Sequence, residues 1–136
     1  MTLLGRNKAV SGTLAESFTL PVSGGVAFAY GEVGYLHTDG TVRKSQRDGT
    51  QVEAKTQVIC LSATIADGAA GLFRGPGRIT GLSGGTGGSD AFVGATAGSI
   101  DTSPPAEGTG HYLTNLGVWV SSSVLLFNPQ PTIGPM

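Results

Sequence analysis

The residues that most often carry out chemistry are few in this sequence and stand apart from one another. Its 136 residues include two histidines, His37 and His111, and a single cysteine, Cys60. Neither histidine lies at the spacing from Cys, Asp or Glu that is typical of a metal site. Cys60 sits within an apolar, β-prone run, which is typical of a buried, inert thiol rather than a nucleophile. The sequence therefore predicts no metal site, no intramolecular disulfide and no thiol catalysis.

Other patterns resemble functional motifs only in part. The glycine-rich stretch 81–88 lacks the Lys-Ser/Thr ending and the following helix of a phosphate-binding loop, so we expect a flexible loop there. Serines 121–123 lack the surroundings of a nucleophile elbow. Trp119 or Tyr112 could stack on a sugar or a base, although core packing is the commoner role of such residues. The nine Asp and Glu residues lie mostly beside glycine or in turns, which leaves a glycosidase pair open without marking one. The sequence predicts that the chain is not an enzyme and takes no cofactor or small-molecule substrate.

The charge of the chain is low. Charged residues make up 12% of the sequence, and the formal net charge is −1. A balance this close to zero does not favour nucleic acid or an anionic membrane surface as a partner. It also gives little electrostatic protection against self-association, which favours a chain that sits in an assembly over a neutral stand-alone domain.

No segment of the sequence predicts export or membrane insertion. The first residues, MTLLGR, contain no apolar stretch long enough for a signal peptide. No run approaches the ~18 apolar residues that a membrane span requires. We therefore expect a chain that is made in a cytoplasm and has no membrane partner.

Short β-prone runs separated by turn residues dominate the sequence. Helical periodicity is almost absent, and many of the 23 glycines fall between apolar runs, where tight turns need positive φ. This pattern predicts an all-β fold, either a small antiparallel β-barrel or a sandwich. We expect an arm or edge strand over residues 1–24, because Pro21 cannot sit in a central strand. The β-barrel domain would span residues 25–129, and the proline-rich tail 130–136 would be extended, in a position to lie along a partner.

The clearest hairpin signal lies in the N-terminal half. Asp39-Gly40 separates two β-prone runs and predicts a type I′ turn, in which both central residues have positive φ. The basic residues Arg43, Lys44 and Arg47 follow it. Exposed charges of this kind are usually solvated, and docking of an acidic partner is the alternative.

A weak repeat connects this hairpin with a later one. Tyr35-Leu36 followed by Gly40-Thr41-Val42 is similar to Phe92-Val93 followed by Gly98-Ser99-Ile100, about 57 residues later. Each copy has an aromatic–aliphatic pair, a small polar turn and a β-branched return strand. Two unrelated hairpins would share these preferences, so the sequence leaves both a true repeat and a coincidence open.

The last two expected strands are apolar on both faces. In Val118-Trp119-Val120 the valines point one way and the tryptophan the other, and in the run 124–127 Leu125 and Phe127 share a face. A small barrel buries only its inner face, so the other face needs cover from a second layer or from neighbouring subunits. Because the chain is short for a second layer, we expect Trp119, Leu125 and Phe127 to pack between subunits.

Motifs spread over about two thirds of the chain resemble a family of tailed-bacteriophage virion proteins. The matching segments, in order, are Tyr35-Leu36-His37-Thr38-Asp39-Gly40-Thr41-Val42, the stretch from Phe92-Val93 to Thr102-Ser103-Pro104-Pro105, Leu116-Gly117-Val118-Trp119-Val120-Ser121, and Leu125-Leu126-Phe127-Asn128-Pro129. Small β-barrel modules of this family occur in capsid decoration (cement) proteins, head fibres and tail-associated fibres, commonly as trimers. Fibres usually carry a long shaft before the barrel, whereas only about 25 residues precede the first clear strand here.

The resemblance implies a capsid decoration protein, a homotrimer that binds the major capsid protein on the outer surface of the phage head and stabilises contacts between capsomers. Its place would be the virion surface, after synthesis in the host cytoplasm. In that role we expect the N-terminal residues Leu3, Leu4, Arg6 and Lys8 to lie on the capsid. One alternative is a head or tail fibre or spike module that binds a host receptor or glycan. A small enzyme or an unrelated β-domain is a third hypothesis.

Overall fold

A computed structural model of the chain describes residues 17–23 and 26–136, and almost all the regular structure in them is β-strand. The predicted all-β class is therefore confirmed. The elements, in chain order, are β1 (Ser17–Pro21), β2 (Phe28–Ala29), β3 (Val33–Leu36), β4 (Val42–Lys44), α1 (Gln51–Ala54), β5 (Val58–Cys60), β6 (Thr64–Ile65), β7 (Ala70–Arg74), β8 (Gly77–Ile79), β9 (Asp90–Val93), β10 (Ile100–Asp101), β11 (Asn115–Trp119) and β12 (Leu125–Phe127).

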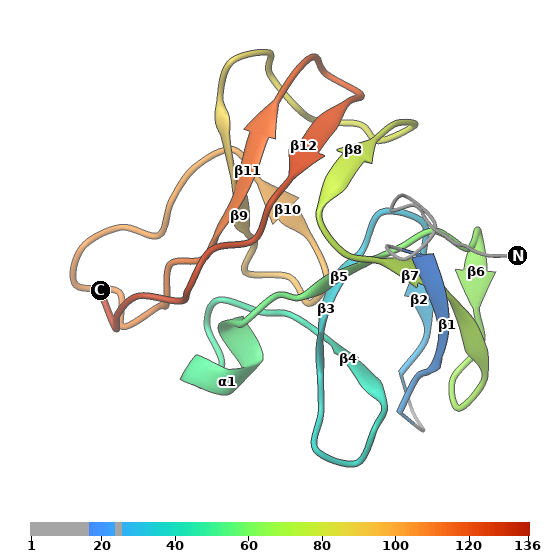
Figure 1. The fold of residues 1–136 in the computed structure, drawn as a ribbon. Helices are drawn as coiled ribbons and strands as arrows, with labels where there is room; N and C mark the ends of the chain where they lie inside the picture. Colours follow the sequence, from blue (N-terminus) through green and yellow to red (C-terminus); the bar gives the residue numbers. More distant parts are fainter. Residues whose placement is uncertain (1–16, 24–25) are drawn as a thin grey trace, which may run out of the picture.

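These strands form two five-stranded antiparallel sheets and a two-stranded ribbon. The N-terminal sheet has the order β1-β7-β5-β3-β4, the C-terminal sheet has the order β10-β9-β11-β12-β8, and β2 pairs with β6 in the ribbon. In Figure 1 the C-terminal sheet occupies the upper part of the view, and the N-terminal sheet and the ribbon lie below it. None of these sheets closes into a barrel. Of the two predicted forms, a barrel and a sandwich, the chain therefore adopts the sandwich-like one, with open sheets packed in layers.

One apolar core lies between the two large sheets. Val33 and Ile59 of the N-terminal sheet contribute to it. Trp119, Leu125 and Phe127 of the C-terminal sheet pack in the same core. The C-terminal sheet therefore uses the face that carries its large side chains to cover one face of the N-terminal sheet.

A second core lies between the opposite face of the N-terminal sheet and the ribbon. Phe28 and Ile65 come from the ribbon, and Cys60 and Phe73 come from the sheet. The rings of Phe28 and Phe73 pack edge to face, with their centroids 5.2 Å apart. β5, the central strand of the N-terminal sheet, is thus covered on both faces, which explains why all of its residues are buried, including the thiol predicted to be so.

The two large sheets repeat one architecture. If the five strands of each sheet are numbered 1 to 5 in chain order, both sheets have the spatial order 3-2-4-5-1. All neighbouring strands in that order are antiparallel. The N-terminal unit supplies β1, β3, β4, β5 and β7, and the C-terminal unit supplies β8 to β12 in the same places. The similarity between two hairpins in the sequence therefore belongs to a repeat of a whole five-strand unit.

Backbone details agree between the two units. Gly31 and Gly88 both have a φ of 85°. The N–H of Gly31 donates to the carbonyl of Cys60 at 2.9 Å, and that of Gly88 donates to the carbonyl of Trp119 at 2.8 Å. In each unit, a positive φ that glycine adopts readily leads the chain into its second strand. Cys60 and Trp119 therefore occupy equivalent positions.

The predicted hairpin at Asp39-Gly40 is present, but its turn is longer than expected. The N–H of His37 donates to the carbonyl of Thr41 at 2.8 Å, and that of Gly40 donates to the carbonyl of His37 at 3.0 Å. The loop therefore has three residues, with Gly40 at a φ of 87°, and is not a two-residue type I′ turn. Asp39 favours the longer loop because its carboxylate accepts from the N–H of Thr41, two residues on.

The glycine-rich stretch 81–88 is held in place rather than free. The N–H of Leu82 donates to the carbonyl of Ser123 at 3.0 Å, and that of Gly85 donates to the carbonyl of Ser122 at 3.1 Å. Gly85 lies against the indole of Trp119, and a Cβ at this position would come within 2.1 Å of a ring carbon. The expectation of a flexible loop is wrong because the glycines allow close approach to a large side chain.

Both ends of the described chain form hydrogen bonds with the rest of the fold. β1 is an edge strand of the N-terminal sheet, as Pro21 predicted, because proline leaves a ladder position without a donor. The tail 130–136 is extended, as expected, but it runs along its own chain. Ile133 and Leu113 exchange two backbone hydrogen bonds of 2.8 Å.

A short helix, α1, interrupts the strands of the N-terminal unit. It begins at a capping box, in which the hydroxyl of Thr50 accepts from the N–H of Glu53 at 3.3 Å. The carboxylate of Glu53 accepts in return from the N–H of Thr50 at 2.7 Å. The sequence did not predict this helix because four residues are too few to show a period of 3.6.

Candidate functional site

The three side chains predicted to pack between subunits lie inside the chain. The exposed fractions of Trp119, Leu125 and Phe127 are 2%, 0% and 1%, and all three belong to the core between the two large sheets. Side chains this buried have no surface left for a partner. The structure therefore corrects their predicted role from interface to core, because the N-terminal unit supplies the second layer that we did not expect from the length of the chain.

The opposite face of the same strands is apolar and exposed. Val118, Val120 and Leu126 are 41%, 51% and 47% exposed. Asp90 on β9 and Arg78 on β8 flank these residues and are exposed as well. We call the surface formed by these five residues the outer face. Large exposed side chains gathered on one face are typical of an interaction surface.

Four residues of the outer face form one row across the sheet. Asp90 is the register partner of Val118 on β11. Val118 also pairs with Leu126 on β12, which pairs in turn with Arg78. Directly opposed residues of antiparallel strands point to the same side of a sheet. The row therefore places an acid at one end, a base at the other, and two apolar side chains between them.

Among residues 17–23 and 26–136, the two charges at the ends of the row have no partner of opposite charge. No ion pair of Asp90 or Arg78 is found within the described part of the chain. The two residues lie three strand spacings apart, which is about 14 Å between backbones. They do not neutralise each other, so the row presents two separate, opposite charges to solvent.

The equivalent row of the N-terminal sheet is buried at its positions on β3 and β5. Its residues, by register, are Val33, Ile59, Arg74 and Ser17. Val33 and Ile59 are 0% exposed and pack in the core that the C-terminal sheet covers. The face that the C-terminal sheet covers on the N-terminal unit is therefore exposed on the C-terminal unit.

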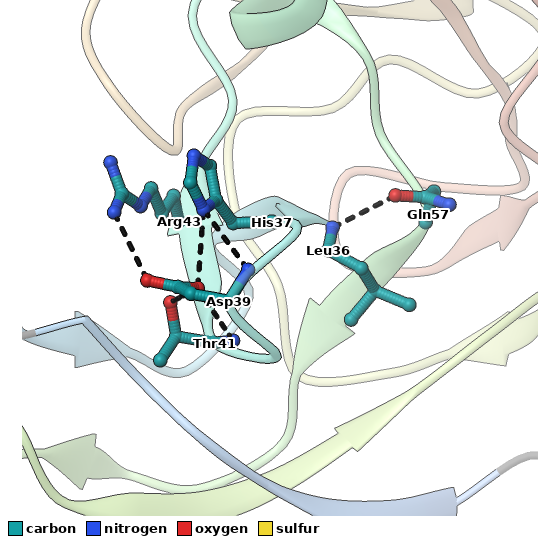
Figure 2. A network of polar contacts seen from close by, with 6 residues as sticks. All are labelled: Leu36, His37, Asp39, Thr41, Arg43 and Gln57. Atoms are coloured by element: carbon teal, nitrogen blue, oxygen red, sulfur yellow. Dashed lines mark hydrogen bonds and ion pairs between the residues drawn. The ribbon is translucent and has the colours of Figure 1, made fainter.

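A separate polar network lies at the tip of the β3–β4 hairpin, as Figure 2 shows. The carboxylate of Asp39 accepts from the hydroxyl and the N–H of Thr41 at 2.6 and 3.0 Å. His37 Nδ1 and Arg43 Nη2 lie 3.2 and 3.3 Å from the same carboxylate. The hydrogen bonds from Thr41, with a smaller contribution from His37, hold the pKa of Asp39 well below its usual range. Because a carboxylate with so low a pKa is a weak base near neutral pH, the network serves the loop rather than proton transfer.

The three basic residues that follow this hairpin each face a carboxylate of their own chain. The nitrogen–oxygen distances are 3.3 Å for Arg43 and Asp39, 3.1 Å for Lys44 and Glu32, and 3.4 Å for Arg47 and Asp101. Charges that are paired in this way do not form a free basic patch. Of the two alternatives for this cluster, the structure favours ordinary surface ion pairs.

A hollow of about 340 Å³ lies beside the same residues. Tyr35, Arg43, Lys44 and Glu53 contribute to its lining. Burial, and then the nearby carboxylate of Glu53, raise the pKa of the Tyr35 hydroxyl, which therefore stays protonated near neutral pH. Both cations of the hollow already contact carboxylates, so little unpaired charge remains to orient a ligand.

The remaining candidate residues are not brought together. His37 lies in the hairpin tip, whereas the carbonyl of His111 accepts from the N–H of Met136 in the tail at 2.8 Å. Within residues 17–23 and 26–136, no group of three or more His, Cys, Asp and Glu side chains is placed to hold a metal ion. In the same residues, no helix is long and apolar enough to cross a bilayer. The residues predicted to contact a capsid, Leu3, Leu4, Arg6 and Lys8, lie outside the described part of the chain.

No protein-family model matches the sequence, and neither does any curated protein.

Part of the outer face was visible in the sequence. Strict alternation predicted that Val118 and Val120 point away from Trp119, and the structure confirms it. The sequence could not show which of the two apolar faces stays open, because that depends on where the N-terminal unit packs. It gave no signal for Asp90 and Arg78, since strand pairing brings them into the row from elsewhere in the chain.

Proposed function

We propose that this chain is a structural virion protein that decorates the outer surface of a phage head as a trimer. It would bind the major capsid protein and stabilise contacts between capsomers. The observation that carries the proposal is the outer face, an exposed apolar surface bordered by charge, in a chain whose sequence motifs resemble phage virion proteins.

Such a protein works through contact area and avidity rather than through chemistry. In a trimer, three copies of one patch contact three neighbouring sites on a capsid at the same time. The second and third contacts are intramolecular once the first has formed, so weak contacts combine into tight binding. The proposal needs no nucleic acid, membrane or small-molecule partner, and it places the protein on the virion after its synthesis in the host cytoplasm.

The proposed capsid contact is the N-terminal segment that contains Leu3, Leu4, Arg6 and Lys8. This segment mixes apolar and basic residues ahead of the folded layers. A deletion of residues 1–12 leaves β1 and both sheets in the chain, so it separates capsid binding from folding.

The test is co-sedimentation of the purified protein with empty capsids assembled from the major capsid protein encoded in the same genome. We expect saturable binding, with a number of bound copies divisible by three for each repeating unit of the capsid lattice. The protein that lacks residues 1–12 should keep its circular dichroism spectrum and lose capsid binding. Retention on a glycan array together with no capsid binding would instead support the fibre or spike alternative.

A further inference from the structure

The outer face corresponds to a surface that this molecule already uses to bind a sheet. Its residues Val118 and Leu126 are equivalent, by register, to Ile59 and Arg74 of the N-terminal sheet. Ile59 is completely buried there, in the core that the C-terminal sheet covers. The layers therefore follow one another in the order ribbon, N-terminal sheet, C-terminal sheet. The outer face is the free side of the last layer, and no described part of the chain covers it.

We propose that further copies of the same chain cover the outer face, in a ring whose rotation axis runs parallel to β11. The argument rests on the order of residues in the row, which has Asp90 at one end and Arg78 at the other. Rotation about an axis parallel to the strands brings the β9 end of one row beside the β8 end of the next. Asp90 of one copy then meets Arg78 of its neighbour at every contact, and the apolar pair in the middle of each row points towards the axis.

The charges disfavour the other simple way to place two such faces together. An axis that lies in the face and runs across the strands would bring Asp90 against Asp90 and Arg78 against Arg78. Like charges at an interface cost free energy and suppress that arrangement. A partner of a different kind would have to supply a base and an acid at the same separation. A second copy already carries them at that separation, because strand pairing fixes it.

A ring of three copies follows from this surface together with the proposed decoration trimer, on which the number three rests. The order of charges in the row fixes only the direction of the rotation axis, parallel to β11, and not the number of subunits. Apolar side chains at the centre with charges at the border match the usual anatomy of a protein interface. The proposed surface and the proposed number of subunits can therefore fail separately.

The first experiment changes the centre of the row. We would measure the absolute mass of the protein by light scattering on a sizing column, for the wild type and for Leu126→Glu. Leu36→Glu is the matched control, because Leu36 is 44% exposed and Leu126 is 47% exposed, but Leu36 lies on the N-terminal sheet. We expect a mass of three chains for the wild type and the control. The Leu126→Glu protein should be a folded monomer, with self-association weakened at least ~100-fold, as expected for a charge buried at the centre of an interface.

The second experiment tests the pairing at the ends of the row. Asp90→Arg and Arg78→Asp each place like charges together at every contact, and each should weaken self-association about tenfold. The double variant Asp90→Arg/Arg78→Asp reverses both ends and restores opposite charges between neighbours. It should return to within about threefold of the wild type, which a merely structural role of either residue would not produce.

The outcomes separate the two proposals. A dimer that Leu126→Glu dissociates would support the surface and overturn the trimer. An oligomer that Leu126→Glu leaves intact would overturn the surface and leave the decoration trimer standing. A wild type that stays monomeric at all concentrations, or a Leu126→Glu protein that keeps its oligomer and loses capsid binding, would overturn self-association through this face.

Discussion

The two five-strand units of this protein have the same strand order and pairing, yet they bury different amounts of their surface. The N-terminal sheet lies between the C-terminal sheet and the β2–β6 ribbon and has an apolar core on each face, although Leu36 and Leu72 remain 44% and 40% exposed. The C-terminal sheet is covered on one face and leaves Val118, Val120 and Leu126 in solvent on the other. The same topology therefore serves as the centre of the fold in one unit and as a boundary with an exposed apolar face in the other.

The units also fill equivalent core positions in opposite ways. Three residues before Gly31, the segment that leads into β3 carries Phe28 on β2, and β5 carries the small Cys60; both belong to one core. The C-terminal unit places Gly85 on the corresponding loop and the large Trp119 on β11, with the glycine against the indole ring. In the first pair the large side chain, Phe28, precedes the strand and the small one, Cys60, lies on it. In the second pair the strand carries the large Trp119 and the preceding loop carries Gly85. Each pair therefore fills its space with one large and one small residue, in opposite positions.

The strongest test of this comparison truncates the two equivalent strand residues. Trp119→Ala should lower the free energy of unfolding by about 3–5 kcal/mol, because it removes a large side chain that is 2% exposed. Cys60→Ala should cost only about 1 kcal/mol, since little volume is lost. Urea unfolding measures both, with Trp119→Phe as the control that keeps most of the volume. Equal costs at the two positions would contradict the proposed division of volume.

The next test compares equivalent residues on the covered and the open face. Ile59→Ala should cost about 2–5 kcal/mol, because Ile59 is completely buried. Val118→Ala should change the free energy of unfolding by no more than about 0.5 kcal/mol, because the side chain is 41% exposed. Both are measured at a protein concentration low enough for the chain to be monomeric, since self-association would add to apparent stability. A large loss for Val118→Ala in the monomer would show that the outer face is covered within the chain.

A third test uses the equivalent glycines Gly31 and Gly88, each of which has a φ of 85°. Gly88→Ala should cost about 1 kcal/mol, the strain of an L-residue in the left-handed region, because no atom lies within 4 Å of its added Cβ. Gly31→Ala should cost about 1 kcal/mol more, because its Cβ would lie 2.5 Å from Leu82 Cδ2. Gly31→Ala/Leu82→Ala removes the clash and should bring the strain back towards that of Gly88→Ala, once the cost of Leu82→Ala alone is subtracted. Equal costs for the two single variants would show that Leu82 moves aside freely.

The units should also differ at alkaline pH, because only one of them carries a thiol at the equivalent position. Burial raises the pKa of Cys60, so the folded protein keeps its proton at a pH where the unfolded chain releases it. This contribution to stability is complete below the pKa of an unfolded thiol, about 8.5, and is lost as the pH rises above it. Cys60→Ala should therefore lose less stability than the wild type between pH 8 and pH 10. The raised pKa of Tyr35 acts in the same direction in both proteins, so Tyr35→Phe is the control.

The smallest expected difference lies in the two hairpin tips. Asp39 in the first hairpin corresponds to Ala97 in the second, next to the equivalent glycines Gly40 and Gly98. Thr41→Val removes the hydroxyl that contributes most to the low pKa of Asp39, so a carboxyl NMR titration should show that pKa moving up towards its ordinary value. The part of the stability that Asp39 provides is present above its unfolded pKa, about 3.9, and is lost as the pH falls. An unchanged pKa in Thr41→Val would assign the shift to the backbone N–H of residue 41, which the variant keeps, and to His37.

Local features of the fold could be predicted from the sequence where a few neighbouring residues decide them. Alternation predicted the strands around Trp119 and Leu125, Pro21 predicted an edge strand, and Asp39-Gly40 predicted a hairpin. The exact loop at Asp39 could not be predicted, because hydrogen bonds of one side chain chose between two turns of similar cost. The repeat was visible only as two similar hairpins, because the two units share strand order and backbone hydrogen bonds rather than residue types.

The sequence by itself determined the β-class of the protein, the two-faced apolar character of its last strands and the scarcity of reactive side chains, because composition and a period of two are local properties. Only the tertiary structure decided which apolar face is core and which is surface. That choice follows from the packing of the N-terminal unit on one side of the C-terminal sheet, a contact between residues far apart in the chain. The same long-range pairing placed Asp90 and Arg78 at the two ends of one row, because register across four strands is set by the whole sheet and not by any single segment.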